Sequence, residues 1–233
     1  MLISAKLRII MVKCWVILSL AAVSLFAQTQ PAPEKPIDQQ RVMGVLPNYR
    51  TANPYDVYSP LSSKQKMTIA AKDSFDSPLF IIGGMFALTG QASNADPSYG
   101  QGVKGFAQRY AANYGDQMIG NMMSEGVMPV LLHEDPRYFR KVEGSVKSRL
   151  WYAATRTFVT HTDRGTLRFN FSEWTGNAFA VAVGQSYHFD DRTAGHAAEK
   201  LVLQAGVDSF SNVLKEFWPD VRKHFSKKNP SKN

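Results

Sequence analysis

Apolar residues recur along most of the chain at the spacing of α-helices, in stretches separated by turn residues. Ser62 or Ser63 can cap a helix that runs to about Ser74. Residues 79–91 are apolar but contain three glycines, which is typical of either a buried helix or a broken one. The other expected helices cover residues 102–132, where Pro129 should kink or end the helix, 145–157, 172–187 with Ser172 as cap, and 193–217, closed by Pro219.

One segment has the alternation of a β-hairpin. Polar and apolar residues alternate on both sides of Asp163-Arg164-Gly165, so we expect one short hairpin near 157–171. The sequence therefore predicts a mainly α-helical fold, a compact helical bundle with this hairpin. Several small residues inside the expected helices favour close helix–helix contact, a geometry that also occurs in membranes. No apolar stretch after residue 27 reaches about 18 residues, which argues against membrane-spanning helices.

The N-terminus has the pattern of a secretory signal peptide over residues 1–27. Three basic residues precede an uncharged, mostly apolar run at 14–27, and a polar segment follows Ala27. The alternative is an uncleaved anchor, but this run spans only about 21 Å as a helix, against about 30 Å for a bilayer core. We therefore expect export to the periplasm or outer envelope of a bacterium. The one cysteine, Cys14, would leave with the signal peptide.

Three further segments follow from composition. Residues 28–60 contain six of the twelve prolines and are expected to form a Pro-rich arm, whose apolar second half can dock along the body. Residues 61–221 form the helical domain. Residues 222–233 form a basic tail, which can either touch anionic lipid or remain solvated.

The net charge of +8 suggests a nucleic-acid partner until its distribution is considered. All of the excess lies in residues 1–27 and 222–233, because residues 28–221 hold 19 basic and 19 acidic groups. A surface that follows a phosphate backbone needs a clustered positive face, which this neutral body does not demand. We therefore expect no nucleic-acid partner. The partners that remain are a membrane surface, another envelope protein or a second copy of the chain.

Local motifs do not identify a cofactor or a metal. Residues 100–105 match G-x-G-x-x-G, but they follow a turn sequence rather than a strand, so a glycine-rich turn is the better interpretation. The stretch that begins His133-Glu134-Asp135 lacks the second histidine of a zinc protease motif. It is more typical of a turn whose acids pair with Arg137 and Arg140. We expect no cofactor and no metal site.

Polar residues on the helices suggest where a site would lie. Three of the expected helices each place an asparagine and at least one carboxylate on a narrow strip among apolar residues. Strips that face inward would form a buried polar cluster, whereas strips that face outward would be ordinary solvated surfaces. The candidate catalytic residues are Asp116, Glu125, His133, Glu173 and Asp208, and the candidate binding residues are Asn121, Asn177 and Asn212.

Three strings in the sequence carry a resemblance. They are Gly105-Phe-Ala-Gln-Arg-Tyr110, the stretch 131–139 that reads LLHEDPRYF, and the stretch 212–220 that reads NVLKEFWPD. With these strings the chain resembles an uncharacterised family of secreted bacterial proteins over residues 41–221. The resemblance implies one domain over that span and brings no activity, substrate or site residue.

Two functions remain open. The first is an exported envelope protein with a non-enzymatic, membrane-peripheral or interaction role, favoured by the signal peptide, the neutral body and the small-residue helices. The alternative is a hydrolase with a carboxylate and histidine site between helices. The hydrolase requires its five candidate residues to lie within about 10 Å of one another around a cleft.

Overall fold

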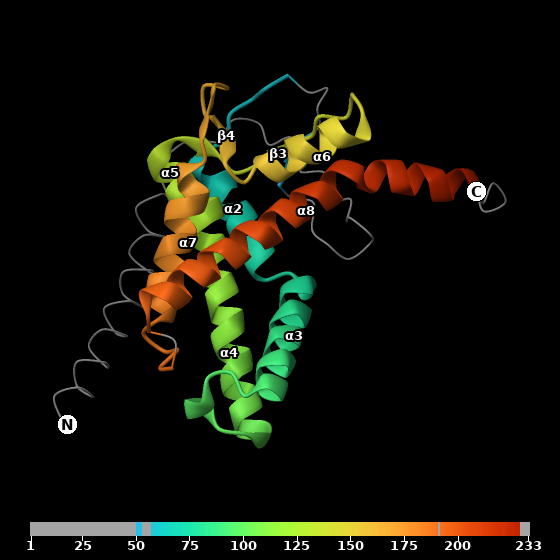
Figure 1. Cartoon of the computed structure of the whole chain (residues 1–233). Helices are drawn as coiled ribbons and strands as arrows, with labels where there is room; N and C mark the ends of the chain where they lie inside the picture. The colour runs from blue at the N-terminus through green and yellow to red at the C-terminus, as the bar shows by residue number, and fades with distance from the viewer. Residues whose placement is uncertain (1–49, 53–56, 191, 229–233) are drawn as a thin grey trace.

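The helices and strands account for most of residues 50–52, 57–190 and 192–228, which are the residues that the computed structural model describes. The predicted signal peptide and most of the arm lie outside these residues. The mainly α-helical prediction is confirmed (Figure 1). The helices are α2 (Ser63–Ser74), α3 (Ser77–Ser93), α4 (Gly102–Asn121), the π-helical η2 (Met122–Val127), α5 (Met128–Leu132), α6 (Val146–Thr155), α7 (Phe171–Gly184) and α8 (Ala194–Lys228), with a short 3-10 turn, η1 (Pro97–Tyr99).

The central axis is the continuous run of α4, η2 and α5. In Figure 1, α3 lies beside the lower half of α4, α7 lies beside its upper half, and α8 crosses the bundle diagonally. The α2 helix packs on η2, and α6 packs on α8. The π-helical segment brings Ser124, Glu125 and Gly126 into the interior, where α2 and α7 both reach it.

The predicted hairpin is present and belongs to a slightly larger sheet. β4 (Val159–Thr162) and β5 (Leu167–Phe169) pair antiparallel, and β2 (Glu134–Asp135) adds to the free edge of β4. A second, two-stranded ladder joins β1 (Thr51–Ala52) of the arm in parallel to β3 (Tyr138–Phe139). The described residues of the arm at 50–52 therefore lie against the body; residues 28–49 and 53–56 of the predicted arm lie outside the described residues.

The helix caps explain where several helices begin. The Ser62 side chain accepts a hydrogen bond from the Gln65 backbone N–H, and the Gln65 side chain accepts one from the Ser62 backbone N–H. The α2 helix therefore starts with a capping box. The predicted cap of α7 lies two residues after the observed one. Asn170, not Ser172, accepts the backbone N–H of Glu173.

Two prolines do not act as the sequence suggested. Pro129 lies in the first turn of α5, directly after the π-helical segment, so its missing N–H costs little and the helical run continues. Pro219 was expected to close the last helix, but α8 continues through it to Lys228. The expected tail at 222–233 is therefore helical as far as residue 228, and 229–233 lie outside the described residues.

The α3 helix corrects both interpretations of residues 79–91. It is unbroken over seventeen residues, and most of its large side chains are exposed rather than buried. Its glycines face α4: a Cβ on Gly83 would lie 3.5 Å from the Cβ of Tyr114, and one on Gly84 would lie 3.7 Å from the Tyr110 ring. Small residues point inward on this helix, and large apolar residues point outward.

The interior as a whole is unusually polar. The buried apolar side chains of the described residues are few and mostly small, whereas the buried charged ones include Lys66, Arg109, Glu134, Asp135 and Glu216. Large apolar side chains are exposed on α3, α6, α7, α8 and the β4–β5 hairpin. A water-soluble domain shows the reverse distribution, because burial of apolar surface is the main term that stabilises it. Among the described residues, no helix is both long and apolar enough to cross a membrane.

The closest helix contact supplies a test of this packing. A Cβ on Gly176 of α7 would lie 2.6 Å from the backbone of Ser124, which cannot yield without moving η2. We expect Gly176→Ala to destabilise the fold by about 1–3 kcal/mol, the usual cost of overpacking. Thermal and chemical unfolding of the full chain would measure this change.

Gly206 provides the matched control, because nothing lies within 4 Å of a Cβ added there on α8. Gly206→Ala is expected to stabilise the chain by about 0.5–1 kcal/mol, since it removes the entropy cost of glycine in a helix. Equal effects of the two changes would contradict the close crossing of α7 and η2.

Candidate functional site

Arg50 of the arm lies at the centre of the polar interior. Its Nη1 is 2.5 Å from Oε1 of Glu125 and its Nη2 is 3.6 Å from Oε2 of Glu173. Its Nε donates to the carbonyl of Pro136 at 3.2 Å. Burial works to lower the pKa of the guanidinium, but the surrounding carboxylates outweigh it and raise this pKa above its ordinary value. Arg50 therefore joins the arm to η2, to α7 and to the segment that follows β2.

Glu125 and Asp73 form a pair of neighbouring buried carboxyl groups. Burial raises the pKa of Glu125 well above its ordinary value, and it also raises the pKa of Asp73. Oε2 of Glu125 and Oδ1 of Asp73 are both buried without a hydrogen-bond donor. Two ionised carboxylates cannot donate to each other, whereas one shared proton would satisfy both oxygens. The geometry thus favours a protonated Glu125 that donates to an ionised Asp73.

A second carboxyl pair joins α7 to α8. Glu173 accepts a hydrogen bond from Asn177 at 2.9 Å, one turn along α7. Asp208 interacts with Glu173, and burial together with that charge raises the pKa of Asp208 well above its ordinary value. Gln204 donates to both oxygens of Asp208 at 3.2 Å. The two carboxyl pairs lie on either side of Arg50.

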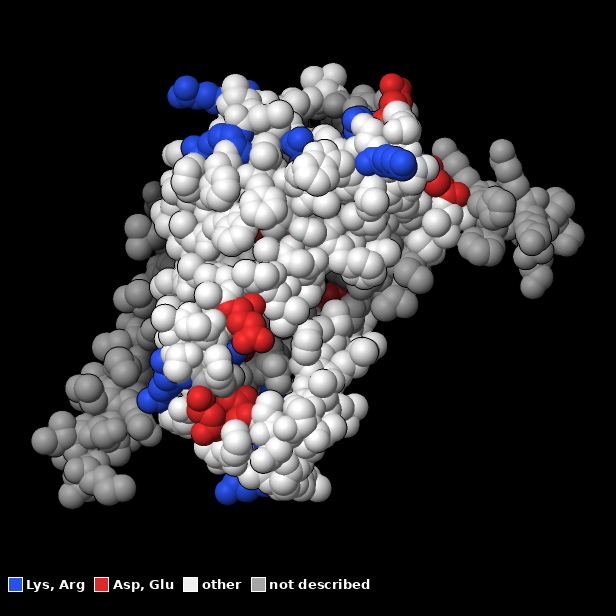
Figure 2. Space-filling view, in the orientation of Figure 1, with Lys and Arg blue, Asp and Glu red and all other residues white. Residues whose placement is uncertain are grey.

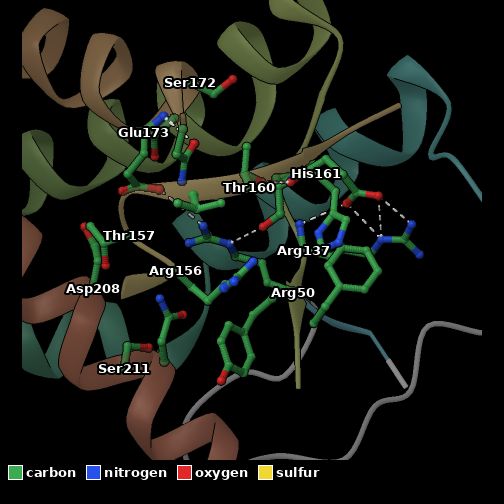
Figure 3. A pocket seen from close by; sticks show the side chains of 18 of the residues that line it. Arg50, Arg137, Arg156, Thr157, Thr160, His161, Ser172, Glu173, Asp208 and Ser211 are labelled. Carbon is green, nitrogen blue, oxygen red and sulfur yellow. Dashed lines mark hydrogen bonds and ion pairs between the residues drawn. The ribbon is translucent and has the colours of Figure 1, made fainter. Parts of the chain in front are cut away.

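A narrow polar pocket opens beside Arg50 (Figure 3). One wall is the α8 stripe, which we define as Asp208, Ser211, Asn212 and Lys215, at helical spacings of three and four residues. The opposite walls come from the strand β4, from the N-terminal turn of α7 and from the segment 135–139. His161 on β4 also lines this pocket, and burial with the nearby Arg156 lowers its pKa.

A second hollow lies on the other side of the Glu173–Asn177 and Gln204–Asp208 contacts. It is lined by α4, α7 and α8 and by Phe86 of α3. The predicted binding residues are divided between the two spaces: Asn121 and Asn177 line this second hollow, and Asn212 lines the first pocket. Amide and aliphatic side chains make up most of the lining of the second hollow, with Asp116 and Lys200, so its surface is less polar than that of the first pocket.

Asp116 belongs to a different cluster from the other predicted carboxylates. Its Oδ2 is 2.8 Å from Nε2 of His188, and its Oδ1 accepts a short hydrogen bond from Tyr187. The other nitrogen of His188 lies 3.2 Å from Asp96. Burial works against the charged imidazole, but the hydrogen bond to Asp116 raises the pKa of His188 above its ordinary value. His188 therefore joins the end of α7 to Asp116 of α4 and to Asp96.

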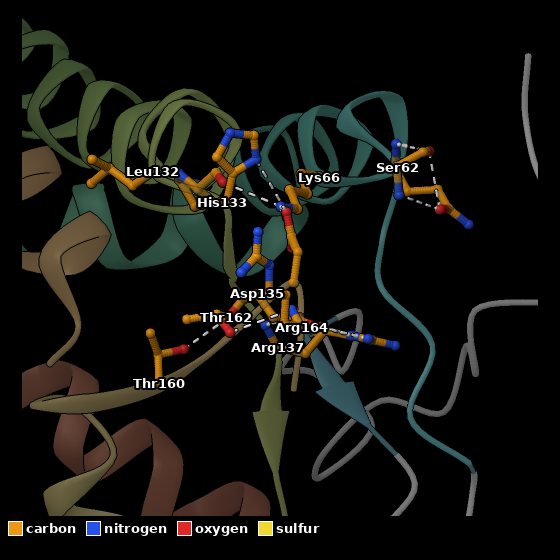
Figure 4. Close-up of polar contacts among 12 residues, drawn as sticks. Ser62, Lys66, Leu132, His133, Asp135, Arg137, Thr160, Thr162 and Arg164 are labelled. Carbon is orange, nitrogen blue, oxygen red and sulfur yellow. Dashed lines mark hydrogen bonds and ion pairs between the residues drawn. The ribbon is translucent and has the colours of Figure 1, made fainter. Parts of the chain in front are cut away.

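His133 is also outside the site. Its side chain is 83% exposed, and it ends α5 in the left-handed region, at a φ of 55°. Its Nδ1 lies 3.8 Å from Asp163, which is held more closely by Lys66 at 2.6 Å (Figure 4). The predicted grouping of five candidates is thus wrong for Asp116 and His133, while Glu125, Glu173 and Asp208 surround Arg50.

The two acids after His133 serve the fold. Arg137 pairs with Asp135 at 2.6 Å, as expected, and Tyr58 of the arm also reaches this carboxylate. Glu134 does not pair with Arg140. It binds Arg168 of β5 at 2.5 Å and accepts the backbone N–H of Ser172 at 2.7 Å. These bonds fasten β2 to the hairpin and to the start of α7.

Glu216 is the most completely satisfied carboxylate of α8. It accepts hydrogen bonds from Tyr138, from the backbone N–H groups of Lys141 and Val142, and from Arg149 at 2.8 Å. Burial alone would raise its pKa, but these bonds together lower it below the ordinary value. Glu216 holds the chain after β3 against α8 and takes no part in the pocket.

Sequence reasoning missed Arg50, Asp73 and Lys215. Asp73 and Lys215 had a detectable signal, since Asp73 continues the row of Lys66, Ile69 and Ala70 on α2, and Lys215 continues the stripe of Asp208 and Asn212. Arg50 gives no such signal, because it lies in the arm outside any helix and its ion pairs are formed with residues far away in the sequence.

The shared proton predicts an unusual pH dependence. Because the pKa of Glu125 is higher in the folded chain than in the unfolded one, the folded state holds the extra proton. The wild type should therefore lose stability as pH rises from the ordinary carboxyl range through the raised pKa, by up to about 1.4 kcal/mol per pH unit. Glu125→Gln keeps an acceptor for Arg50 and a donor for Asp73, so its unfolding free energy should show a flatter pH profile.

Glu125→Leu is the control for this experiment. It removes the partner of Arg50 and leaves a buried charge, so it should destabilise the fold at every pH by about 3–5 kcal/mol. Urea unfolding across a pH series would measure all three proteins. Parallel profiles for the wild type and Glu125→Gln would contradict the shared proton.

The arrangement around Arg50 can bind and orient a polar group and can hold protons, but its described residues do not form a metal centre. Among the described residues, no group of three or more His, Cys, Asp or Glu side chains is placed to hold a metal ion. No hydroxyl of the described pocket is hydrogen-bonded to a histidine.

No protein-family model, no curated protein and no solved structure matches the chain.

Proposed function

We propose that the protein is an exported envelope protein that acts as a non-enzymatic, membrane-associated domain, with the outer face of α3 in lipid. The observation that supports this most is the inverted arrangement of α3, with glycines toward α4 and large apolar side chains outward. The predicted signal peptide, which lies outside the described residues, supports the export.

The outer face of α3 has no charge to keep it in water. None of its seventeen residues is Asp, Glu, Lys or Arg. Ile81, Met85 and Leu88 lie on one side at spacings of four and three residues, and each is about 60% exposed. A continuous apolar face of this kind is unfavourable in water and favourable in hydrocarbon. Inside-facing glycines likewise suit helices that associate within lipid, where packing rather than water exclusion holds them together.

The distribution of charge over the rest of the molecule favours lipid over a protein partner. Figure 2 shows white surface over α3 and over the upper middle of the molecule, with Lys and Arg at the end formed by α5, β4 and α6 and again at the opposite end, and with Asp and Glu in the lower middle. The exposed apolar side chains are spread over most of the helices and the β4–β5 hairpin rather than gathered into one patch with a polar rim. A protein interface forms one bounded patch, whereas lipid contacts the side chains on every face that enters the bilayer.

The hydrolase alternative has weaker support. Three of its five residues, Glu125, Glu173 and Asp208, surround Arg50, and they are paired with one another or with cations. The described part of the pocket supplies no hydroxyl–histidine pair for nucleophilic attack. The two residues meant to complete the site, Asp116 and His133, lie elsewhere.

Vesicle flotation tests the membrane role. The full chain should float with vesicles made of phosphatidylcholine alone, because the attraction is apolar. A triple variant with Ile81→Ser, Met85→Ser and Leu88→Ser should partition at least about tenfold less, since each side chain gains more than about 1 kcal/mol in hydrocarbon.

The control removes three aliphatic side chains that are at least as exposed, from the arm, α5 and α6: Val57→Ser, Leu131→Ser and Val146→Ser, which are 88%, 60% and 68% exposed in the wild type. It should float like the wild type. A wild-type chain that stays in the lipid-free fraction would end the proposal. So would self-association through Ile81, Met85 and Leu88 seen by analytical ultracentrifugation, since that would assign the face to a second copy.

A further inference from the structure

His188 is buried with a carboxylate on each side of its ring. Only 4% of its side chain is exposed. Its Nε2 lies 2.8 Å from Oδ2 of Asp116 on α4, and its Nδ1 lies 3.2 Å from Oδ2 of Asp96, in the connection between α3 and η1. Its backbone N–H donates to the carbonyl of Gly184 at 2.9 Å, so the ring is fixed to the last turn of α7. One imidazole therefore joins three parts of the fold.

Both contacts can be hydrogen bonds only while the imidazole is protonated. An ionised carboxylate accepts and cannot donate, a charged imidazole donates from both nitrogens, and a neutral one donates from a single nitrogen. Loss of the proton therefore leaves a nitrogen lone pair facing a carboxylate oxygen. The contact with Asp96 is the one that should be lost, because it is the longer of the two and because Asp116 is also held by the hydroxyl of Tyr187.

The surroundings of the ring favour this proton. Burial works to lower the pKa of His188, and so does the like charge of Lys200, but the hydrogen bond to Asp116 and the carboxylate charges raise it above its ordinary value. The titratable and charged groups that lie against the ring or act on it are Asp96, Tyr99, Asp116, Tyr187 and Lys200. Burial raises the pKa of Tyr99 to about 12 and also raises that of Tyr187, so neither phenol changes charge near neutral pH, whereas an imidazole does.

The longer contact fastens one end of the helical bundle. We define the tip as residues 94–101, the chain that joins α3 to α4 around η1. Figure 1 shows this connection beside the one between α7 and α8. Two other bonds cross between them: the Tyr99 hydroxyl donates to the carbonyl of Tyr187 at 2.8 Å, and the Ser98 backbone N–H donates to Asp190 at 2.9 Å and lowers the pKa of that exposed carboxyl. Neither of these two bonds depends on a group that titrates near neutral pH.

The tip is held in shape from its other side, independently of His188. Arg109 of α4 donates through Nε to the carbonyl of Ala95 and through Nη1 to that of Gly100, both at 2.7 Å, and through Nη2 to that of Asp96 at 3.1 Å. Loss of the imidazole contact should therefore let the tip move as a unit relative to α7 without unfolding it.

We propose that His188 is a pH-sensitive latch between the tip and the end of α7. The protonated imidazole holds Asp96 and closes the latch, and the neutral imidazole releases Asp96 and loosens the tip. The α3 helix ends at the tip and packs along α4, so the latch controls how firmly the end of this helix pair is held against α7. The latch stands independently of the membrane proposal, because its contacts involve none of the exposed side chains on the outer face of α3.

Hydrogen exchange of the full chain, followed between about pH 5 and about pH 9, tests the latch. Because the pKa of His188 is raised in the folded chain, the closed latch contributes stability below the ordinary histidine pKa and loses it as pH rises through the raised one. Protection factors, which remove the intrinsic effect of pH on exchange, should therefore fall in the tip by at least about tenfold, the loss expected for one charge-assisted hydrogen bond. His188→Gln keeps a donor for Asp116 but no charge, so its tip should be less protected at low pH and should show no such fall.

His133→Gln is the matched control, because the His133 side chain is 83% exposed at the end of α5 and lies near Asp163 rather than the tip. The protection of its tip should follow that of the wild type at every pH. A wild-type tip whose protection factors stay constant over this range would overturn the latch. An equal fall in the wild type and in His188→Gln would do the same, because another group would then be responsible for it.

Nuclear magnetic resonance of the imidazole groups adds a measurement on the unaltered chain. The His188 ring should titrate above the ordinary histidine pKa, with a proton on both nitrogens below its titration midpoint. Asp96→Asn should lower this pKa, because it removes one of the two carboxylates that favour the charged ring. A wild-type His188 that titrates at or below the ordinary value would contradict the latch, even if a variant failed to fold. Neither experiment uses vesicles, so a failure of flotation affects the membrane proposal alone.

Discussion

The ion pairs of Arg50 determine how the interior of this protein is organised. A guanidinium inside a bundle must be surrounded by acceptors, and here they come from η2, from α7 and from the chain after β2. Once Glu125 and Glu173 lie against it, Asp73 and Asp208 become their neighbours, and the pKa of one carboxyl group in each pair, Glu125 and Asp208, is raised well above its ordinary value. The arm is therefore a structural part of the body, because it supplies the charge that the helices enclose.

The π-helical segment makes this arrangement sterically feasible. Glu125 lies within it, between Ser124 and Gly126, and both neighbours are in close contact with other helices. A Cβ on Gly126 would lie 3.0 Å from Ala70 of α2, and the Gly176 position of α7 meets the backbone of Ser124. Such segments often occur at functional sites because they turn a side chain out of the regular α-helical phase. In this protein the change of helical phase brings the carboxyl group of Glu125 to the place where α2, η2 and α7 meet.

Much of the fold could be predicted from the sequence because it depends on local signals. The cap of α2 at Ser62, the Asp163-Arg164-Gly165 turn and the helical spacing of apolar residues all act over a few positions. The α7 and α8 stripes likewise brought Glu173 and Asp208 together, since neighbours at i and i+4 share a face. Asp116 and Glu125 were placed on one strip in error, because nine residues make two and a half α-helical turns and put them on opposite sides.

What the sequence could not reveal depended on long-range contacts or on the surroundings of the molecule. The role of Arg50 depends on partners at least 75 residues away. The direction of α3 was ambiguous for a different reason: an apolar helix with three glycines can bury its large side chains or its small ones. In water, burial of the large side chains is favoured. In lipid, burial of the glycines is favoured, because the helices then come into close contact and the large side chains lose no free energy by facing outward. The orientation of α3 is therefore the observation on which the proposed membrane role rests.

The polar interior and the apolar exterior follow from the same constraint. When large apolar side chains face outward, the space between helices is left to small residues and to polar groups that can pair with one another, as Glu173 does with Asn177 and Arg149 with Glu216. Hydrogen bonds and ion pairs are stronger in surroundings that exclude water, so such an interior is held most firmly where the exterior is also dry.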